Sequence, residues 1–287
     1  MIGLSSIGLK LIRLKTLFIK DKNLRRKQRQ LLEKQYIKDL IKKYKWGISY
    51  SVFDGEELLE ASIKSVRKNA DYINVVYQKN SWYGEKSNNN LLPLLQKLKE
   101  QKLIDELIEY IPNYNLSAGK QERAKRNIGL KAAYKHGCRY FMTMDTDEFY
   151  LHDEVEMGKE FIIKNNVTHA FCAQIRYAQK PTQMILDKQG CFEQFFSRIY
   201  WFSKLEPNKK AVVLTDPTRR LSHYFWAKYR VITELRMHHM TLVRKNLAKK
   251  LQNSSCKNTR GLAKQAGNLK IPTAEVPDIF GLSKLIS

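Results

Sequence analysis

The chain has 287 residues, of which 43% are hydrophobic, so it can bury a substantial core and wholesale disorder is excluded. Its formal net charge of +24 comes almost entirely from two segments: residues 1–45 carry 14 Lys and Arg against 3 acidic residues, and residues 219–264 carry 12 against 1. The intervening residues 46–218 are nearly neutral, which argues against a protein that binds nucleic acid over its whole surface.

Cysteine spacing excludes two further classes of protein. The four cysteines are Cys138, Cys172, Cys191 and Cys256. None belongs to a C-x-x-C pair, and their spacings are wide and uneven, so neither a zinc site nor a disulfide framework is expected. Reduced thiols in a cytoplasm fit this pattern.

The first 45 residues predict a basic helical extension. Apolar residues recur at spacings of three or four, at Leu4, Ile7, Leu11, Leu14 and Phe18. Basic residues interrupt this stretch, so it is too polar to span a membrane and lacks the layout of a signal peptide. A second charged helical stretch follows. Two interpretations stay open: peripheral contact with an anionic membrane surface, or ordinary helices that pack on the body.

From residue 46 onward the pattern alternates between strands and helices. Strands are predicted at residues 47–53, 71–78, 108–111 and 139–144, and helices at 56–68, 91–107 and 121–136. Asp54-Gly55 marks a turn after the first strand, and Gly137 stands where a glycine ends a helix. This alternation predicts an α/β fold with a mostly parallel central sheet flanked by helices, which binds ligands at the carboxyl ends of its strands.

The most informative stretch is the apolar strand that runs into Asp145-Thr146-Asp147. On an extended chain, side chains at positions i and i+2 point to the same side, so the two carboxylates are expected to converge on one hard cation. Mg²⁺ or Mn²⁺ takes such oxygen ligands and completes its shell with phosphate and water. The alternative is a strand that ends in solvated acids.

Four stretches together resemble a known family. They are GISYSVFDGEELLEASIKSV, QERAKRNIGLKAAYKHG, YFMTMDTDEF and ELRMHHMTLVRKNLAKKLQNSS. In this order they are similar to glycosyltransferases of the GT-A fold, near the large family 2 group of bacterial transferases, over residues 46–260. The resemblance implies a Rossmann-like sheet, a D-x-D metal motif, a nucleotide-sugar donor, expected to be a UDP-sugar, and Mn²⁺ or Mg²⁺.

The resemblance also implies roles for particular residues. Asp145 would contact the ribose or the metal, Asp147 would be the main metal ligand, and His238 or His239 would supply a third ligand. A buried and an exposed ring on one strand is the alternative for the two histidines. Ser51, Asp54 and Glu56 match the turn that lines the nucleobase pocket, and a plain solvated turn is the alternative for them.

One position departs from the family. Its members carry an acid after the second strand, where this chain has Val76-Tyr77-Gln78-Lys79-Asn80. Gln78 or Asn80 would then hydrogen-bond the base, which puts the identity of the nucleotide in doubt.

Several other polar residues are candidates with open alternatives. Arg123, Lys125 and Arg126 lie on the helix before the D-x-D motif and suit phosphate, although a solvated helix face is favoured for Lys125. Asn127 is unfavourable inside a helix, which suggests a partner. If transfer inverts configuration it needs a base, for which Asp216 is our candidate, and Asp153, Glu193 and Glu234 are also available. Glu193 lies in an aromatic run, CFEQFFSRIYWF, that is expected to be core.

We therefore expect three regions: a basic amphipathic extension (1–45), a glycosyltransferase domain (46–260) and a C-terminal tail (261–287). The expected function is metal-dependent transfer of a sugar to a glycan or lipid-linked acceptor in bacterial cell-surface polysaccharide or lipopolysaccharide synthesis. The expected location is the cytoplasm, at the inner face of the plasma membrane. One alternative is a basic nucleic-acid-binding protein, against which the near-neutral charge of residues 46–218 argues. The other is a metal-dependent nucleotidyltransferase. No P-loop is present.

Overall fold

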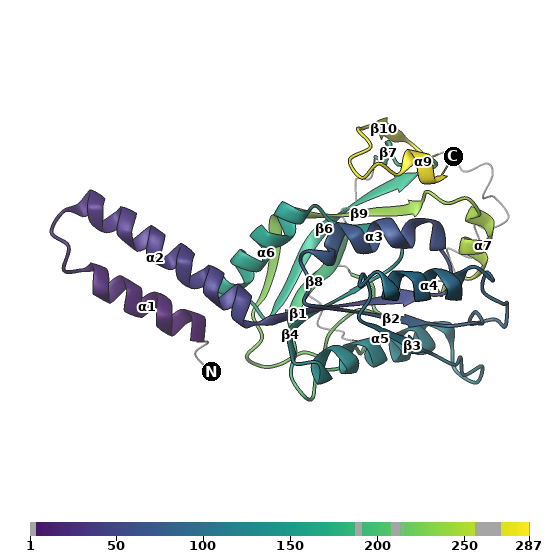
Figure 1. The fold of residues 1–287 in the computed structure, drawn as a ribbon, viewed down its shortest axis with the longest axis horizontal. Coiled ribbons are helices and arrows are strands. Elements are labelled where there is room, and N and C mark those ends of the chain that lie inside the picture. Colours follow the sequence, from purple (N-terminus) through teal and green to yellow (C-terminus); the bar gives the residue numbers. More distant parts are fainter. Residues whose placement is uncertain (1–3, 187–190, 208–212, 214, 256–270, 287) are drawn as a thin grey trace.

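The computed structural model describes residues 4–186, 191–207, 213, 215–255 and 271–286 (Figure 1). The strands are β1 (Lys45–Val52), β2 (Tyr72–Tyr77), β3 (Glu106–Glu109), β4 (Cys138–Met144), β5 (Glu148–Phe149), β6 (His169–Ala178), β7 (Gln183–Ile185), β8 (Phe192–Arg198), β9 (Tyr229–Leu242) and β10 (Thr273–Glu275). The helices are α1 (Leu4–Thr16), α2 (Lys22–Lys43), α3 (Glu56–Arg67), α4 (Leu91–Glu100), α5 (Ala118–Lys135), α6 (His152–Asn165), α7 (Leu247–Gln252) and α9 (Ser283–Ile286).

The strands form one mixed sheet in the order β10-β7-β6-β8-β4-β1-β2-β3, with β9 beside β6. Its central part, β4-β1-β2-β3, is parallel throughout. Beyond β4 the sheet continues through antiparallel pairs with β8, and β9 returns to run parallel to β6. The predicted α/β fold with a mostly parallel central sheet flanked by helices is confirmed, and the antiparallel outer half is what the sequence did not predict.

Helices cover both faces of the sheet (Figure 1). One face buries Ile48 and Tyr50 of β1 against Leu59 of α3 and Leu95 of α4 in the largest hydrophobic cluster. The other face buries apolar side chains of α5 against β2 and β4. Alternate strand residues point to opposite faces, so each strand contributes to both layers. Phe195 and Phe196 are fully buried, so the part of the aromatic run next to Glu193 is core as predicted, whereas Trp201 and Phe202 at its end are exposed.

A buried polar bridge fixes α5 on the sheet. Ser49 of β1 donates to Asn74 Oδ1 (2.7 Å), and Asn74 donates to the Gly129 carbonyl of α5 (3.0 Å). A Cβ at Gly129 would lie 1.8 Å from Ser49 Oγ, so only glycine lets the helix approach this closely. The bridge thereby sets the position of the basic side chains that α5 carries one turn earlier.

Residues 4–43 form a helical hairpin, α1 and α2, that projects from the body (Figure 1). Asp21 caps α2 by accepting from the backbone N–H groups of Asn23 and Leu24. The carboxyl-terminal half of α2 packs on the body, because Ile37 and Leu40 belong to the largest hydrophobic cluster. None of the helices among the described residues is both long and apolar enough to cross a lipid bilayer.

Two predicted boundaries were wrong. The helix predicted for residues 91–107 ends at Glu100, and the strand predicted for 108–111 is Glu106–Glu109. Lys102 adopts φ of 59°, and Leu103 N–H bonds back to the Leu98 carbonyl, so the chain turns there despite its run of leucines. The glycine stop at Gly137 is confirmed, with φ of 80°.

The described part of the predicted C-terminal tail packs on the body. Strand β10 pairs with β7, and Leu282 is fully buried beside Leu58 and Phe149. Cys138, Cys172 and Cys191 form no disulfide among the described residues, and Cys256 lies outside them.

Candidate functional site

The predicted site residues gather where the parallel strands end. Asp54 follows β1, Gln78 follows β2, and Asp145 follows β4. These three strands are hydrogen-bonded neighbours that run in the same direction, so their carboxyl ends share one edge of the sheet. Such an edge is where open α/β sheets bind ligands.

The D-x-D stretch is a turn and not an extended strand. Strand β4 ends at Met144, and residues 145–147 turn into β5, with the Glu148 N–H bonded to the Asp145 carbonyl (3.3 Å). The expectation of an extended chain from Asp145 to Asp147 is therefore wrong. The two carboxylates have different ion-pair partners, and each must be described separately.

Asp147 is the acid of a base-rich centre. Its side chain is 3% exposed, and its Oδ2 contacts Lys250 Nζ, Arg244 Nη2 (3.1 Å) and His239 Nε2 (3.5 Å). Burial opposes ionisation of Asp147, but the charges of Lys250, Arg244 and His239 outweigh it and hold its pKa well below the usual range. Asp147 is thus a carboxylate that gathers three basic groups from β9 and the segment after it.

Glycine at position 55 lets Arg244 reach this centre. Gly55 has φ of 80°, and a Cβ there would lie 1.6 Å from Arg244 Nη1 and 2.3 Å from Thr146 Oγ1. Arg244 Nη2 also donates to Thr146 Oγ1 (3.1 Å). The Asp54-Gly55 turn predicted from sequence therefore has a second purpose, because it makes room for a guanidinium beside Asp147.

Asp145 belongs to a second, acid-rich centre. It accepts from Arg126 Nη2 (3.0 and 3.1 Å) and from Arg219 Nη2 (2.5 Å), and its side chain is 31% exposed. Burial opposes ionisation, but Arg126 and Arg219 hold the pKa of Asp145 below its usual range.

Arg219 is the hub of the acid-rich centre. Besides Asp145 it pairs with Glu148 (2.5 Å), Glu193 (3.6 Å) and Asp216 (3.5 Å). Glu193 is 5% exposed, and burial raises its pKa to about 8 against the opposing charge of Arg219, with the charge of Glu148 raising it further. One guanidinium therefore serves four carboxyl groups, of which Glu193 is the one held protonated near neutral pH.

The structure separates the two histidines that the sequence left equivalent. Strand β9 pairs with β5 so that His239 lies opposite Glu148 and His238 opposite Phe149. His239 faces Asp147 and bonds through Nδ1 to Gln174 (3.0 Å), whereas His238 Nδ1 bonds to Tyr177 (2.8 Å) and its ring packs against Phe280. Only His239 stands beside the D-x-D turn. Burial lowers the pKa of His238 to about 4, with Arg236 adding to the effect, so it is a neutral core ring.

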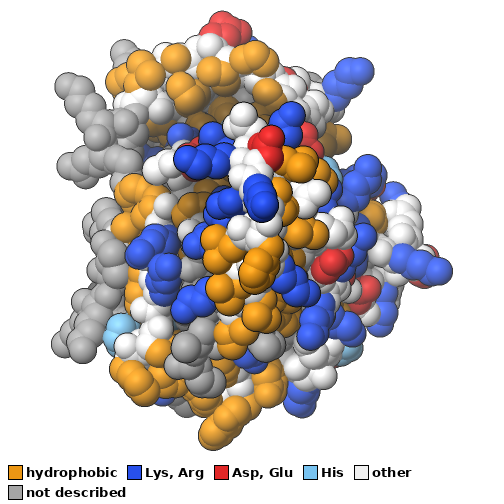
Figure 2. Space-filling view, turned by 90° about the vertical axis from the view of Figure 1, so that its left-hand side faces the viewer, with side chains coloured by type: hydrophobic (Ala, Val, Ile, Leu, Met, Phe, Trp, Pro, Cys, Tyr) orange, Lys and Arg blue, Asp and Glu red, His pale blue; other side chains and the backbone are white. Residues whose placement is uncertain are grey.

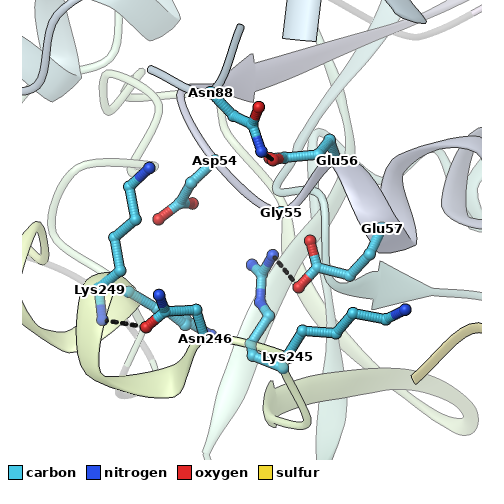
Figure 3. A pocket seen from close by; sticks show the side chains of 10 residues that line it. Asp54, Gly55, Glu56, Glu57, Asn88, Lys245, Asn246 and Lys249 are labelled. Carbon is cyan, nitrogen blue, oxygen red and sulfur yellow. Dashed lines mark hydrogen bonds and ion pairs between the residues drawn. The ribbon is translucent and has the colours of Figure 1, made fainter. Parts of the chain in front are cut away.

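A pocket of about 370 Å³ opens beside the base-rich centre (Figure 3). Its walls come from the turn after β1 with the start of α3, from Asn88, and from the segment that leads into α7. The lining residues are Asp54, Gly55, Glu56, Glu57, Asn88, Arg244, Lys245, Asn246, Lys249 and Lys250. Glu56 accepts from Asn88 (2.5 Å), and Glu57 lies 3.9 Å from Arg244. Four basic side chains thus meet in one cavity, with Lys250 and Arg244 held from behind by Asp147.

Some predicted binding residues lie beside the pocket and not in it. Gln78 is fully buried, and neither polar atom of its amide has a hydrogen-bond partner among the described residues. Lys125 is also buried, which contradicts the solvated face favoured from sequence: its Nζ donates to the Val52 carbonyl (2.7 Å) and lies 5.5 Å from the Trp82 ring centroid. Burial and the neighbouring charge of Arg126 lower the pKa of Lys125 to about 7. Ser51 lies in β1 opposite Val76 and does not line the pocket.

Two other candidates have structural partners. Asn127 donates to the Leu205 carbonyl (2.9 Å) and accepts from the Leu205 N–H (2.7 Å), so its amide ties α5 to a loop and is not free to hold a ligand. Asp216 Oδ1 accepts from the N–H and the hydroxyl of Thr218 (2.7 and 2.8 Å), which orders the loop that carries Arg219. Arg123 is half-buried on α5, and it does not line the pocket.

The donor set as it stands does not fit a divalent cation. Both oxygens of Asp145 accept from arginine, and Oδ2 of Asp147 is shared by three basic groups. Within the described ranges, no cluster of three His, Cys, Asp or Glu side chains could hold a metal ion. A cation that bound Oδ2 of Asp147 would have to displace Lys250 and Arg244. The predicted metal role of Asp145, Asp147 and the histidines therefore stays a prediction.

Sequence reasoning missed most of the pocket's basic wall. Arg244, Lys245, Lys249 and Lys250 all fall in the basic segment 219–264, which was recognised only as a source of net charge. The density of basic residues directly after the histidine pair was the available signal.

Comparisons with known proteins add little. No family model matches the chain. No curated protein matches it. Among solved structures it is similar to S. aureus TarS 1-349 in complex with UDP, with a TM-score of 0.34 and 14% identity over 46% of this chain and 36% of that one. For the complex of the same protein with UDP-GlcNAc the values are 0.35, 16%, 46% and 35%. The match spans about a third of those chains, and TM-scores this low carry no argument about family or function.

Proposed function

We propose that the chain is a glycosyltransferase that moves a sugar from a nucleotide-sugar donor, a UDP-sugar, to a glycan or lipid-linked acceptor in cell-surface polysaccharide synthesis in the cytoplasm. The observation that carries the proposal is the pocket of about 370 Å³ at the carboxyl edge of the parallel strands, where four basic side chains line one wall and three acidic ones, Asp54, Glu56 and Glu57, line the other. A diphosphate needs countercharge, and this cavity supplies it where α/β sheets bind nucleotides.

In the proposed reaction the acceptor hydroxyl attacks the anomeric carbon of the donor sugar. The bond from that carbon to the diphosphate oxygen breaks, and the nucleoside diphosphate leaves with the bonding electrons. Arg244, Lys249 and Lys250 would stabilise the negative charge that develops on this leaving group. Asp147 is a positioning residue in this scheme, since it contacts Arg244 and Lys250 and holds them beside the pocket.

Requirement for Mn²⁺ or Mg²⁺ is predicted by the D-x-D resemblance, but no step above depends on it. The base for the acceptor is also left open. Asp216, the candidate from sequence, is engaged with Thr218 and Arg219, and Glu193 is buried beside Arg219.

The test is binding of UDP to the purified chain by calorimetry, with a variant that carries Lys245→Gln and Lys249→Gln. Both lysines line the pocket, but neither contacts Asp147, so the ion cluster behind the pocket stays intact. Charge-assisted contacts contribute about 1.5–3 kcal/mol each, so we expect loss of both lysines to lower UDP affinity by at least about 100-fold. The matched control carries Lys131→Gln and Lys135→Gln on the exposed end of α5, far from this edge of the sheet.

UDP binding that is equal in the pocket variant and the control would contradict the proposal. Release of UDP from a panel of UDP-sugars then identifies the donor, and the same assay in EDTA and in Mn²⁺ tests metal dependence separately. Duplex DNA that binds with high affinity and competes with UDP would favour the nucleic-acid alternative.

A further inference from the structure

The α1–α2 hairpin presents an apolar stripe to solvent. Ile7, Leu11, Leu14 and Phe18 are 44%, 52%, 56% and 89% exposed. Their spacings of four, three and four residues place them on one side of α1 and the turn that follows it. Single exposed apolar residues need no explanation, but a row at helical spacing does.

The opposite side of α1 is the one that packs on α2. Leu9 is 9% exposed and Thr16 is 2% exposed, and Gly8 lies so close to Tyr36 of α2 that a Cβ would come within 2.1 Å of that ring. The outward stripe is therefore not the surface that holds the hairpin together, and its four side chains keep 44–89% of their surface exposed.

Basic side chains surround a groove of about 540 Å³ between the two helices. It is lined by Arg13, Lys22, Arg25, Arg26, Arg29, Gln30 and Glu33. Arg25 donates to the Ile19 carbonyl (2.7 Å), and Arg29 donates to Thr16 Oγ1 (3.2 Å). Arg13 pairs with Glu33 (3.3 Å), so three of the groove's side chains are held in place by specific contacts. Five basic groups against one acid leave it strongly cationic.

The apolar and basic features lie at the same end of the molecule. The turn between α1 and α2, which carries Phe18, is the part of the hairpin farthest from the body (Figure 1). Figure 2 looks onto the end from which the hairpin projects and shows hydrophobic and basic side chains next to one another, with few acidic ones. Residues 1–45 carry 14 basic residues against 3 acidic ones.

We propose that this hairpin docks on an anionic phospholipid surface, with Leu14 and Phe18 entering the acyl boundary and the groove around Arg26 receiving lipid phosphates. An exposed apolar row together with a cationic groove supplies the two signals that stable peripheral binding requires. Nucleic acid would match the charge, but it gives no reason for exposed leucines and a phenylalanine at helical spacing. A second copy of the chain would match the apolar row but would be repelled by the basic groove.

The test is co-sedimentation of the full chain with vesicles of phosphatidylcholine that contain about 30% phosphatidylglycerol. Vesicles of phosphatidylcholine alone are the control. We expect binding to the anionic vesicles, with a strong decrease as salt rises. Leu14→Ser with Phe18→Ser should weaken it by about 100-fold, and Lys22→Gln with Arg26→Gln by roughly 30-fold. These four side chains are exposed, so the hairpin should fold without them.

Matched controls are Ile111→Ser, which removes an apolar side chain that is 80% exposed on the body, and Lys99→Gln with Lys131→Gln, which removes two exposed charges there. Equal vesicle binding by hairpin variants and controls would overturn the proposal. Two other results would also overturn it, each in the absence of any vesicle binding. One is that the parent chain binds single-stranded RNA and the hairpin variants do not. The other is that the parent chain is a dimer that Phe18→Ser converts to a monomer. UDP binding in solution is measured alongside, and it should be unchanged in every hairpin variant, so failure here is separate from failure of the proposed function.

Discussion

Asp145 and Asp147 are two residues apart, yet they belong to ion clusters of opposite balance. Around Arg219, one guanidinium contacts four carboxyl groups, whereas around Asp147 one carboxylate contacts three basic groups. The first cluster joins β4, β5, β8 and the loop at residues 215–220. The second faces the pocket through Lys250 and Arg244. A D-x-D turn can therefore place one acid in an acid-rich network and the other behind the basic side chains of a pocket.

The largest expected effect comes from substituting Arg219 in the acid-rich cluster. Arg219→Met removes the only cation that contacts both Glu148 and Glu193 among the described residues, and it leaves these buried carboxyl groups without an ion-pair partner. Breaking a buried pair in this way costs about 3–5 kcal/mol, so we expect a loss of that size in the free energy of unfolding in urea. Lys204→Gln, at an exposed ion pair with Glu206 nearby, is the control and should cost under about 1 kcal/mol.

A second substitution tests whether this loss comes from uncompensated charge. Arg219→Met combined with Glu148→Gln removes the charge that Arg219→Met leaves unpaired, and it should be more stable than Arg219→Met alone. If the double variant is less stable by the sum of the two single effects, Arg219 does not act as the counterion that its geometry indicates.

The base-rich cluster gives the next largest effect. Asp147→Asn leaves Arg244 and Lys250 without their carboxylate, and we expect roughly 1–3 kcal/mol of stability to be lost. Both cations still line the pocket, so UDP should still bind, within about 10-fold of the parent affinity. A different result would assign Asp147 a metal-ligand role in place of the ion-pair role. In that case the parent binds UDP only in the presence of Mn²⁺, and the folded Asp147→Asn variant does not bind UDP in Mn²⁺.

The sequence was sufficient for the fold's centre because the signals there are local. Strand and helix alternation, the Asp54-Gly55 turn and the Gly137 stop each depend on a few consecutive residues, and all three appear in the structure. The ion clusters were not predictable in the same way. Arg219 contacts Asp145 across 74 residues and Lys250 contacts Asp147 across 103, and nothing in local spacing selects those partners.

Burial of single polar residues was equally beyond the sequence. Helical periodicity alone left Lys125 on a solvated face, and only the approach of α5 to β1 at Gly129 brings its ammonium to the Val52 carbonyl. The histidine pair shows the same limit, because the β5–β9 register decides which ring meets Asp147.

The dependence of stability on pH distinguishes the two clusters by their titration. Burial raises the pKa of Glu193 to about 8, above its value of about 4.5 in the unfolded chain, so between these two values the native state binds more protons than the unfolded state. Stability should therefore fall as pH rises from 4.5 to 8, by at most about 1.4 kcal/mol per pH unit. The pKa values of Asp145 and Asp147 are lowered, so their contribution is present at neutral pH and is lost only as pH falls below about 3.8. In Glu193→Gln, the free energy of unfolding in urea should no longer fall between pH 4.5 and 8, and its loss below about pH 3.8 should be unchanged. If the variant keeps the slope between pH 4.5 and 8, Glu193 is ionised in the native state, as a fully effective Arg219 counterion would make it.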